Sequence, residues 1–162
     1  MRIAVYPGSF DPITNGHLNI IERATNIFDK IIVGVANNPK KSTLFSAPER
    51  IDMIKEVTKN LEKVKIQSFS GLLIDFMKSN KASIIIRGMR AISDFEHESQ
   101  LALMNKRLAP EIETIFMVTC SKYSYLDSSI VKEIASLNGC INQLVPEIVE
   151  KKLREKLFNK NI

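Results

Sequence analysis

The sequence has few of the residues and runs that mark secreted, metal-binding and membrane proteins. Its 162 residues include no tryptophan and only two cysteines, Cys120 and Cys140. The cysteines belong to no Cys-x-x-Cys or Cys/His pattern, so we expect free thiols and no metal ligands among them. No stretch has the pattern of a signal peptide or the apolar length of a membrane span. We therefore expect a soluble, cytoplasmic protein with no membrane partner.

Two common phosphate-binding motifs are also missing. The chain contains neither G-x-x-x-x-G-K-[ST] nor G-x-G-x-x-G, which argues against a P-loop enzyme and a dinucleotide-dependent dehydrogenase. The net charge of +5 would suit nucleic acid or a phosphorylated small molecule. Much of this excess lies in the basic stretch 151–160, and the other basic residues are scattered without interleaved aromatic side chains. We expect no nucleic-acid partner.

Short apolar runs alternate with amphipathic segments along the chain. The composition, 44% hydrophobic over 162 residues, is enough for one substantial core. The apolar runs predict strands at residues 2–6, 31–36, 64–67, 82–87 and 114–118. The amphipathic segments predict helices at 16–29, 47–60, 71–80, 94–108, 128–137 and 146–159. This alternation is typical of an α/β fold. We expect a single doubly wound, Rossmann-like domain over residues 1–162, with a five-stranded parallel sheet, helices on both faces and a C-terminal helical segment.

The stretch Y-P-G-S-F-D-P-I-T-N-G-H, residues 6–17, joins the first predicted strand to the first predicted helix. It places His17 near the start of that helix, where backbone N–H groups and the helix dipole favour an anion. A histidine at this position can also simply cap the helix or face solvent. The residues alone leave both roles open.

Polar and cationic residues follow four of the predicted strands, at the sheet edge where ligands bind in doubly wound folds. They are Gly8, Ser9, Phe10 and residues 14–17 after the first strand, Lys40 and Lys41 after the second, residues 87–90 after the fourth and 121–129 after the fifth. These loops offer cations, hydroxyls and amides but almost no nucleophile with a base beside it, which indicates phosphate binding. Taken singly, the lysines could form a solvated loop, the arginines could pair with Asp94 or Glu96, and Ser128 and Ser129 could cap a helix.

Three motifs in order resemble the bacterial phosphopantetheine adenylyltransferases. Thr14-Asn15-Gly16-His17, at the end of the first stretch, resembles the T/H-x-G-H motif of the nucleotidyltransferase superfamily. R-G-M-R-A-I-S-D-F-E-H-E (87–98) and Y-L-D-S-S-I-V-K-E (125–133) resemble the narrower family. The resemblance implies a single nucleotidyltransferase domain that transfers the adenylyl group of ATP to 4′-phosphopantetheine. The products would be dephospho-coenzyme A and pyrophosphate, in coenzyme A biosynthesis.

The resemblance also implies roles for individual residues. The implied catalytic residues are His17, Lys41 and Arg90. The implied ATP-binding residues are Ser9, Phe10, His17, Gly88, Met89, Arg90, Glu98, Tyr123, Ser124, Tyr125, Leu126, Asp127, Ser128 and Ser129. The implied phosphopantetheine-binding residues are Ser9, Lys41, Leu73 and Arg87. Mg²⁺ carried with ATP and a homohexamer are implied as well. The chain departs from the family pattern at Ser9 (often threonine), His97 (tyrosine) and Asp127 (usually serine).

The implied chemistry explains why no general base is evident. A phosphate monoester has a second pKa of about 6, so the nucleophile is largely dianionic at neutral pH. The difficulty is the repulsion between two polyanions, which cations and oriented amides offset. Three alternatives remain open: a nucleotide-binding module without catalysis, a fragment related to aminoacyl-tRNA synthetases, and an adenylyl- or cytidylyltransferase acting on nicotinamide mononucleotide or glycerol 3-phosphate.

Overall fold

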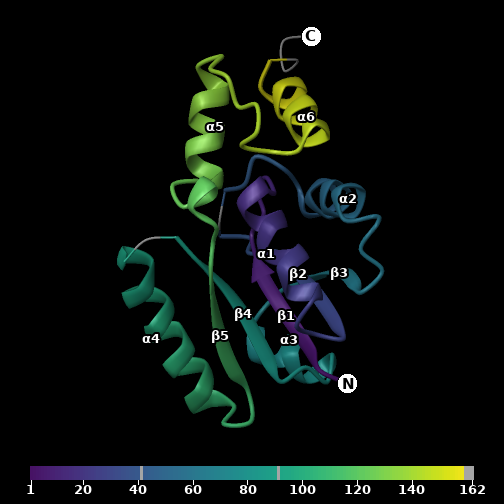
Figure 1. Ribbon diagram of the computed structural model, residues 1–162, viewed down its shortest axis with the longest axis vertical. Helices are drawn as coiled ribbons and strands as arrows, with labels where there is room; N and C mark the ends of the chain where they lie inside the picture. The colour runs from purple at the N-terminus through teal and green to yellow at the C-terminus, as the bar shows by residue number, and fades with distance from the viewer. Residues whose placement is uncertain (41, 91, 159–162) are drawn as a thin grey trace.

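The computed structural model describes residues 1–40, 42–90 and 92–158, and within them strands and helices alternate along the chain (Figure 1). The strands are β1 (Ile3–Gly8), β2 (Lys30–Ala36), β3 (Val64–Phe69), β4 (Ile84–Met89) and β5 (Glu113–Val118). The helices are α1 (Asn15–Thr25), α2 (Ala47–Val57), α3 (Leu73–Ser79), α4 (Ile92–Leu108), α5 (Ser128–Ser136) and α6 (Glu147–Phe158), with a short 3₁₀ turn at Ser121–Tyr123.

The five strands form one sheet in the order β3-β2-β1-β4-β5, and all neighbouring pairs are parallel. The predicted α/β fold class is thereby confirmed. The chain runs from β1 outward to β2 and β3, and then crosses to the other side of β1 to form β4 and β5. The strand order therefore reverses between β1 and β4, the place where doubly wound sheets open a crevice for ligands.

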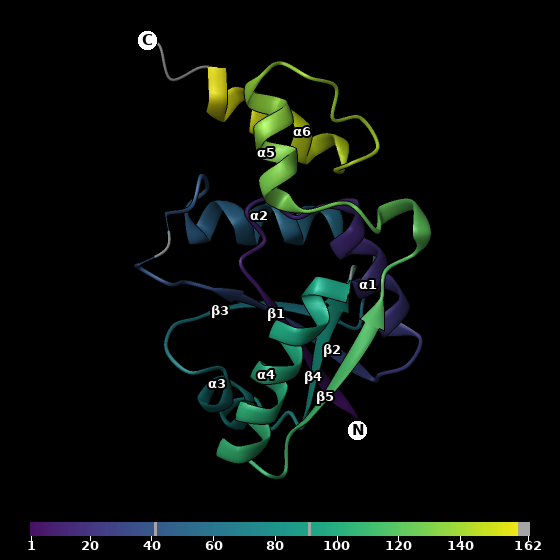
Figure 2. The same cartoon turned by 90° about the vertical axis from the view of Figure 1, so that its left-hand side faces the viewer.

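Both faces of the sheet are covered, as alternating side chains of β1 show. Ala4 and Tyr6 belong to a large buried cluster that includes residues of α1, α2, α5 and α6. Val5 points the other way, into a smaller cluster with residues of α3 and of the segment after α4. Figure 2 shows α1 and α2 on one side of the sheet and α3 and α4 on the other. A strand that is buried on both faces accounts for the continuous apolar run read in the sequence.

Element ends differ from the predictions at two places that matter for the site. The strand predicted at 2–6 continues through Pro7 and Gly8, which pair with Gly34 and Val35 of β2. Pro and Gly usually interrupt strands, so the sequence pattern ended too early. The helix predicted at 16–29 ends at Thr25. The apolar pattern of the sequence extends past the end of the helix because Phe28 is also buried in the core. Phe28 belongs to a turn, in which its N–H donates to Ala24 O.

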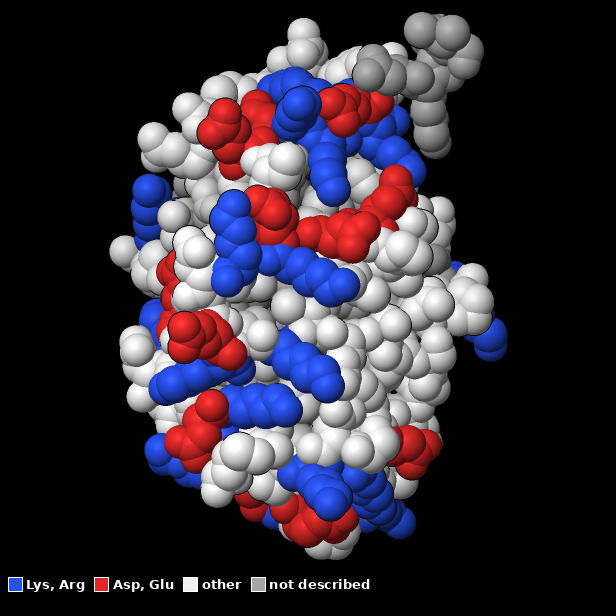
Figure 3. All heavy atoms as spheres, turned by 90° about the vertical axis from the view of Figure 1, so that its right-hand side faces the viewer, with Lys and Arg blue, Asp and Glu red and all other residues white. Residues whose placement is uncertain are grey.

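The helices α5 and α6 lie beyond the carboxyl ends of the strands (Figure 1). None of the described helices is both long and apolar enough to cross a membrane. On the face that carries α2 and α6, lysine and arginine side chains are interspersed with aspartate and glutamate and form no unbroken basic surface (Figure 3). Such a mixture of both signs is typical of a solvated surface.

Candidate active site

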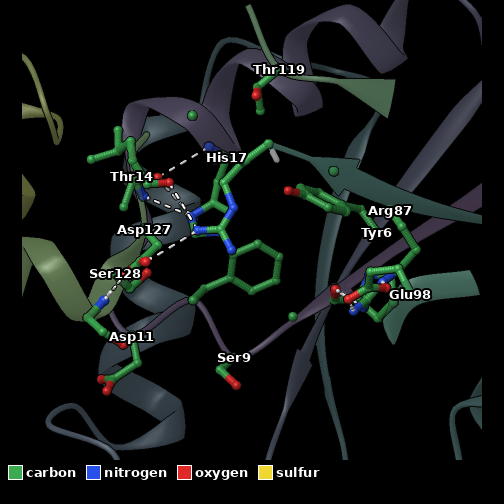
Figure 4. A pocket seen from close by; sticks show the side chains of 18 of the residues that line it. Tyr6, Ser9, Asp11, Thr14, His17, Arg87, Glu98, Thr119, Asp127 and Ser128 are labelled. Atoms are coloured by element: carbon green, nitrogen blue, oxygen red, sulfur yellow. Dashed lines mark hydrogen bonds and ion pairs between the residues drawn. The ribbon is translucent and has the colours of Figure 1, made fainter. Parts of the chain in front are cut away.

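A pocket of about 350 Å³ opens at the carboxyl ends of β1 and β4, where the strand order reverses. Its walls come from the β1–α1 turn, the end of β4, α4, the residue after β5, and the start of α5. The lining residues are 6–11, Thr14, Gly16 and His17; Arg87, Gly88 and Arg90; Glu98; Thr119; and 126–129 with Lys132. Figure 4 shows these side chains converging from segments far apart in the sequence.

The β1–α1 turn is shaped by an unusual backbone conformation at Phe10, whose φ is 48°. This conformation turns the Phe10 ring back over Gly8, and a Cβ atom at Gly8 would lie 2.9 Å from Phe10 Cζ. A side chain at position 8 would therefore displace the Phe10 ring from this place. The Phe10 ring packs edge-on against Tyr6 at 5.4 Å and against His17 at 5.1 Å between ring centroids.

Asp11 ties three distant segments together beneath the pocket. Its carboxylate accepts hydrogen bonds from the backbone N–H groups of Leu44 and Phe45, each at 2.9 Å, and from Lys132 Nζ at 2.7 Å. Burial alone would raise the pKa of Asp11, but the Lys132 hydrogen bond and the two amides outweigh it and hold the pKa below its usual range. Asp11 is therefore ionised at neutral pH and fixes Lys132 at the pocket wall.

His17 is both a helix cap and a pocket residue. Thr14 is the N-cap of α1: its Oγ1 accepts the His17 N–H at 3.3 Å, and the Thr14 backbone N–H donates to His17 Nδ1 at 3.1 Å. Nδ1 must therefore carry a lone pair, which puts the proton of the neutral ring on Nε2. Figure 4 shows the ring between Thr14 and, across the pocket, Tyr6 and Arg87. The Nε2–H edge is the one available to donate to a ligand.

The protonation of His17 gives a direct test of this geometry. Burial, and to a smaller extent the charge of Arg90, lowers the pKa of His17 to about 4, although Asp127 acts in the opposite direction. We expect ¹⁵N NMR of the ligand-free protein to show a neutral Nε2–H ring from pH 8 to about pH 5. The chain has two histidines, so His97→Gln assigns the signals. Protonation near pH 6.5, or a proton on Nδ1, would contradict the geometry. Since the unfolded chain binds this proton first, His17 lowers stability as the pH falls from about 6.5 toward 4.

Arg87 lines the pocket and forms an ion pair with Glu98. Its Nε and Nη2 donate to the two carboxylate oxygens of Glu98, and its Nη1 donates to Pro7 O at 3.2 Å. The structure thus pairs Arg87 with Glu98, a carboxylate that the alternative reading of the sequence did not name. The sequence assigned Arg87 and Glu98 to different ligands, and the structure brings them together.

Arg90 and Asp127 approach each other at the start of α5. Arg90 Nη1 donates to Leu126 O at 3.2 Å and lies 3.7 Å from Asp127 Oδ2. Asp127 is the N-cap of α5, and its Oδ1 accepts from Ser129 N at 2.7 Å and Ile130 N at 2.9 Å. The carboxylate therefore accepts the backbone N–H groups of two first-turn residues of α5.

Most of the residues assigned to ligands from the sequence line this one pocket: Ser9, Phe10, His17, Arg87, Gly88, Arg90, Glu98 and residues 126–129. Met89, Tyr123, Ser124, Tyr125 and Leu73 do not line it. Met89 ends β4 and its carbonyl accepts from Thr119, Tyr123 to Tyr125 belong to the 3₁₀ turn and the residues after it, and Leu73 begins α3. Lys41 lies outside the described residues.

The sequence reading missed five pocket residues: Tyr6, Pro7, Asp11, Thr119 and Lys132. Lys132 could have been found, because it lies three and four residues after Ser129 and Ser128 and so shares their helix face. Thr119 is the first residue after β5 and satisfies the strand-end rule. Tyr6 reads as an ordinary core residue, and burial raises the pKa of its phenol. Nothing in the sequence pattern pairs Asp11 with Lys132.

The chain matches known proteins over almost its whole length. Residues 5–134 match the cytidylyltransferase-like family model. A phosphopantetheine adenylyltransferase of Clostridium tetani is 56% identical over 160 residues, covering 99% of this chain and 100% of the relative. One from Carboxydothermus hydrogenoformans is 58% identical and covers 96% of both chains. A solved structure described as a nicotinate-nucleotide adenylyltransferase, from Vibrio parahaemolyticus, superposes with a TM-score of 0.71, covering 99% of this chain and 97% of that one.

The structural match is only 16% identical in sequence and therefore supports the fold alone. The sequence matches show more than the fold, because more than half of the aligned residues are identical over 156 to 160 residues. The chain therefore belongs to the phosphopantetheine adenylyltransferases, within the cytidylyltransferase-like family.

Proposed function

We propose that this protein transfers the adenylyl group of ATP to 4′-phosphopantetheine, which forms dephospho-coenzyme A and pyrophosphate in coenzyme A biosynthesis. The observation that carries the proposal is the inventory of the pocket. It combines a neutral imidazole, two guanidinium groups, an ammonium group and a helix N-terminus at the strand-order reversal. Such an inventory suits two phosphorylated ligands that must be brought together.

The reaction on this reading is a direct attack by the phosphate of phosphopantetheine on the α-phosphorus of ATP. One P–O bond forms to the incoming oxygen, and the bond to the bridging oxygen of the leaving pyrophosphate breaks. The attacking phosphate has a second pKa of about 6 and needs no general base at neutral pH. The chain's own contribution is to align the two phosphates and to offset their mutual repulsion.

His17 is proposed to donate its Nε2–H to the α-phosphate as negative charge builds there. A neutral donor is already in place in the ligand-free protein, because Thr14 holds Nδ1 as an acceptor and burial keeps the ring unprotonated. The ring is also fixed on its other side by Phe10. A donor held in this way loses little freedom when the transition state forms.

The remaining residues are assigned to one or both of the two substrates. Arg90 is proposed to bind the outer phosphates of ATP, and Lys41 to bridge the two reacting phosphates. The proposed ATP-binding residues are Ser9, Phe10, His17, residues 88–90, Glu98 and residues 123–129. The proposed phosphopantetheine-binding residues are Ser9, Lys41, Leu73 and Arg87.

Magnesium is proposed to be held mainly by the triphosphate of ATP. Among the described residues, no three histidine, cysteine or acidic side chains form a group that could hold a metal ion. The carboxylates at the pocket each have a cationic partner: Asp11 with Lys132, Glu98 with Arg87 and Asp127 with Arg90. This set fits an ion that arrives with ATP, where it would neutralise phosphate charge.

The proposed activity is tested by pyrophosphate release with ATP and Mg²⁺. The purified protein is offered 4′-phosphopantetheine, nicotinamide mononucleotide and glycerol 3-phosphate in parallel. We expect turnover with phosphopantetheine at least about 10²-fold above the other two, because only that substrate matches the family. Equal or greater turnover with another acceptor would overturn the assignment.

A homohexamer is also proposed, and an uncovered apolar surface supports an assembly. On α4, the exposed fraction is 49% for Phe95, 73% for Leu103 and 54% for Met104. The neighbouring edge strand β5 adds Val118, 65% exposed. Large apolar side chains that are exposed on a helix and on a neighbouring edge strand are typical of a surface that another copy covers, and an edge strand invites pairing.

Replacing Leu103 with lysine is expected to reduce the assembly to smaller species, because it places a charge in the proposed interface. Light scattering coupled to gel filtration measures the mass. Leu137→Lys is the matched control, since Leu137 is equally exposed (77%) but lies at the end of α5. An unchanged mass for Leu103→Lys, or the same loss for both variants, would contradict this interface.

A further inference from the structure

Arg50, on α2, is a buried cation outside the pocket described above. Its exposed fraction is 2%, and it is among the largest fully buried side chains of the described residues. Nη1 donates to Ser9 O at 2.5 Å and to Ala36 O at 3.0 Å. Its Nε is buried and has no hydrogen-bond partner within the part of the chain that the structure describes.

Burial of the Arg50 guanidinium is an inefficient way to stabilise the fold. A buried guanidinium loses its hydration, and burial accordingly lowers the pKa of Arg50. The carboxylate that acts on it electrostatically, Asp11, is already paired with Lys132. An apolar side chain of similar size would fill the same space without desolvating a charge. The two carbonyl groups that accept its hydrogen bonds therefore indicate what Arg50 does.

The two carbonyl groups belong to segments that shape the pocket. Ser9 O is the carbonyl of the peptide bond that leads into Phe10, the residue with φ of 48°. A positive φ is uncommon for a phenylalanine and persists only where the surroundings fix it. Ala36 O lies at the end of β2. Arg50 thus anchors the turn after β1 to the end of its neighbouring strand.

The anchored turn leads directly to His17. With Ser9 O held, the Phe10 ring lies over Gly8 and packs edge-on against the His17 ring at 5.1 Å. We propose that Arg50 is a positioning residue for adenylyl transfer, which acts by holding the Ser9–Phe10 peptide so that Phe10 fixes the His17 ring. The inference rests on the proposed role of His17 and adds a residue that touches neither substrate.

A double-mutant cycle between Arg50→Met and His17→Ala tests the inference. We expect Arg50→Met to lower kcat by about tenfold or more and to change each KM by less than about threefold, since positioning acts on the transition state. In the His17→Ala background, the same substitution is expected to lower kcat by less than about twofold, because the group that it positions is gone.

Two further variants separate positioning from general destabilisation. Arg50→Lys keeps a charged donor near Ser9 O and is expected to recover part of the lost kcat. Thr58→Val is the matched control: it removes a buried hydrogen bond, Thr58 Oγ1 to Ile54 O at 2.7 Å, at the far end of the same helix. It is expected to leave kcat unchanged. Circular dichroism verifies folding, and if Arg50→Met does not fold, the same cycle is run with Arg50→Lys.

Equal loss of kcat in both backgrounds would overturn the inference, because Arg50 would then act independently of His17. A change confined to KM, or a loss of kcat matched by Thr58→Val, would overturn it as well. Failure of the proposed function is a different result: the unmodified protein would then show no transfer to phosphopantetheine at all.

Discussion

Replacing His17 with alanine is expected to lower kcat by about 10² or more while ATP affinity changes by less than about threefold. The ring donates to charge that develops in the transition state, and removal of one such preorganised donor costs about 2.7–4 kcal/mol. Ground-state binding is spread over many groups of the pocket, so it depends little on this one. Steady-state kinetics and calorimetric titration with ATP measure the two effects separately.

His97→Ala is the control for this experiment, because it is the chain's other histidine, is exposed and does not line the pocket. His17→Ala also removes the acceptor of the Thr14 N–H, which is expected to lower stability by about 1 kcal/mol. Assays are therefore run well below the melting temperature. A His17→Ala variant that keeps kcat within threefold of the unmodified protein, or that loses ATP binding in step with kcat, would refute the proposed role.

Replacing Asp11 with alanine is expected to lower the free energy of unfolding by about 3 kcal/mol at pH 7. The substitution leaves the amides of Leu44 and Phe45 without an acceptor and Lys132 without its partner. Asp11 is almost fully buried, so water cannot easily replace these bonds. Urea denaturation at a fixed protein concentration measures the loss, since any assembly makes stability concentration-dependent.

The pH dependence and two further variants sharpen this prediction. The pKa of Asp11 is lowered in the folded state, so its contribution is complete above about pH 4 and is lost as the pH falls further. Glu56→Gln, which breaks the exposed pair with Lys59, is expected to leave the unfolding midpoint nearly unchanged. Asp11→Ala combined with Lys132→Met is expected to recover part of the loss, because no unpaired charge remains. A single variant as stable as the unmodified protein would refute the role of Asp11.

The fold could be read from the sequence because its signals are local. Apolar runs and amphipathic segments alternate, and the Ser46–Glu49 capping box marks the start of α2 as the pattern indicates. The rule that ligands bind beyond the strand ends selected three loops that line the pocket, those after β1, β4 and β5. Strand ends were less certain, since Pro7 and Gly8 disfavour a strand by themselves and are held in it by pairing with β2.

The pairings within the site could not be read in this way. Arg87 with Glu98, and Asp11 with Lys132, join residues whose distance depends on how helices pack against the sheet. The sequence does not show which side chains meet when a helix packs against the sheet. The same holds for Arg50, which lies in an ordinary amphipathic helix and would be expected on its solvated face. The burial of Arg50 follows from the packing of α2 against the ends of β1 and β2, which the sequence does not show.

Two ion pairs at the pocket, Arg87 with Glu98 and Arg90 with Asp127, affect how tightly a phosphate binds there. An incoming polyanion does not fill a vacant positive site but competes with a carboxylate for each guanidinium, so binding is an exchange of partners. This competition weakens the complexes of reactants and products alike, and such uniform weakening leaves the barrier from the bound state unchanged. Since both reactants and both products are polyanions, the resident carboxylates also act as displacing groups that help each product leave. The same ion pairs therefore weaken substrate binding and favour product dissociation.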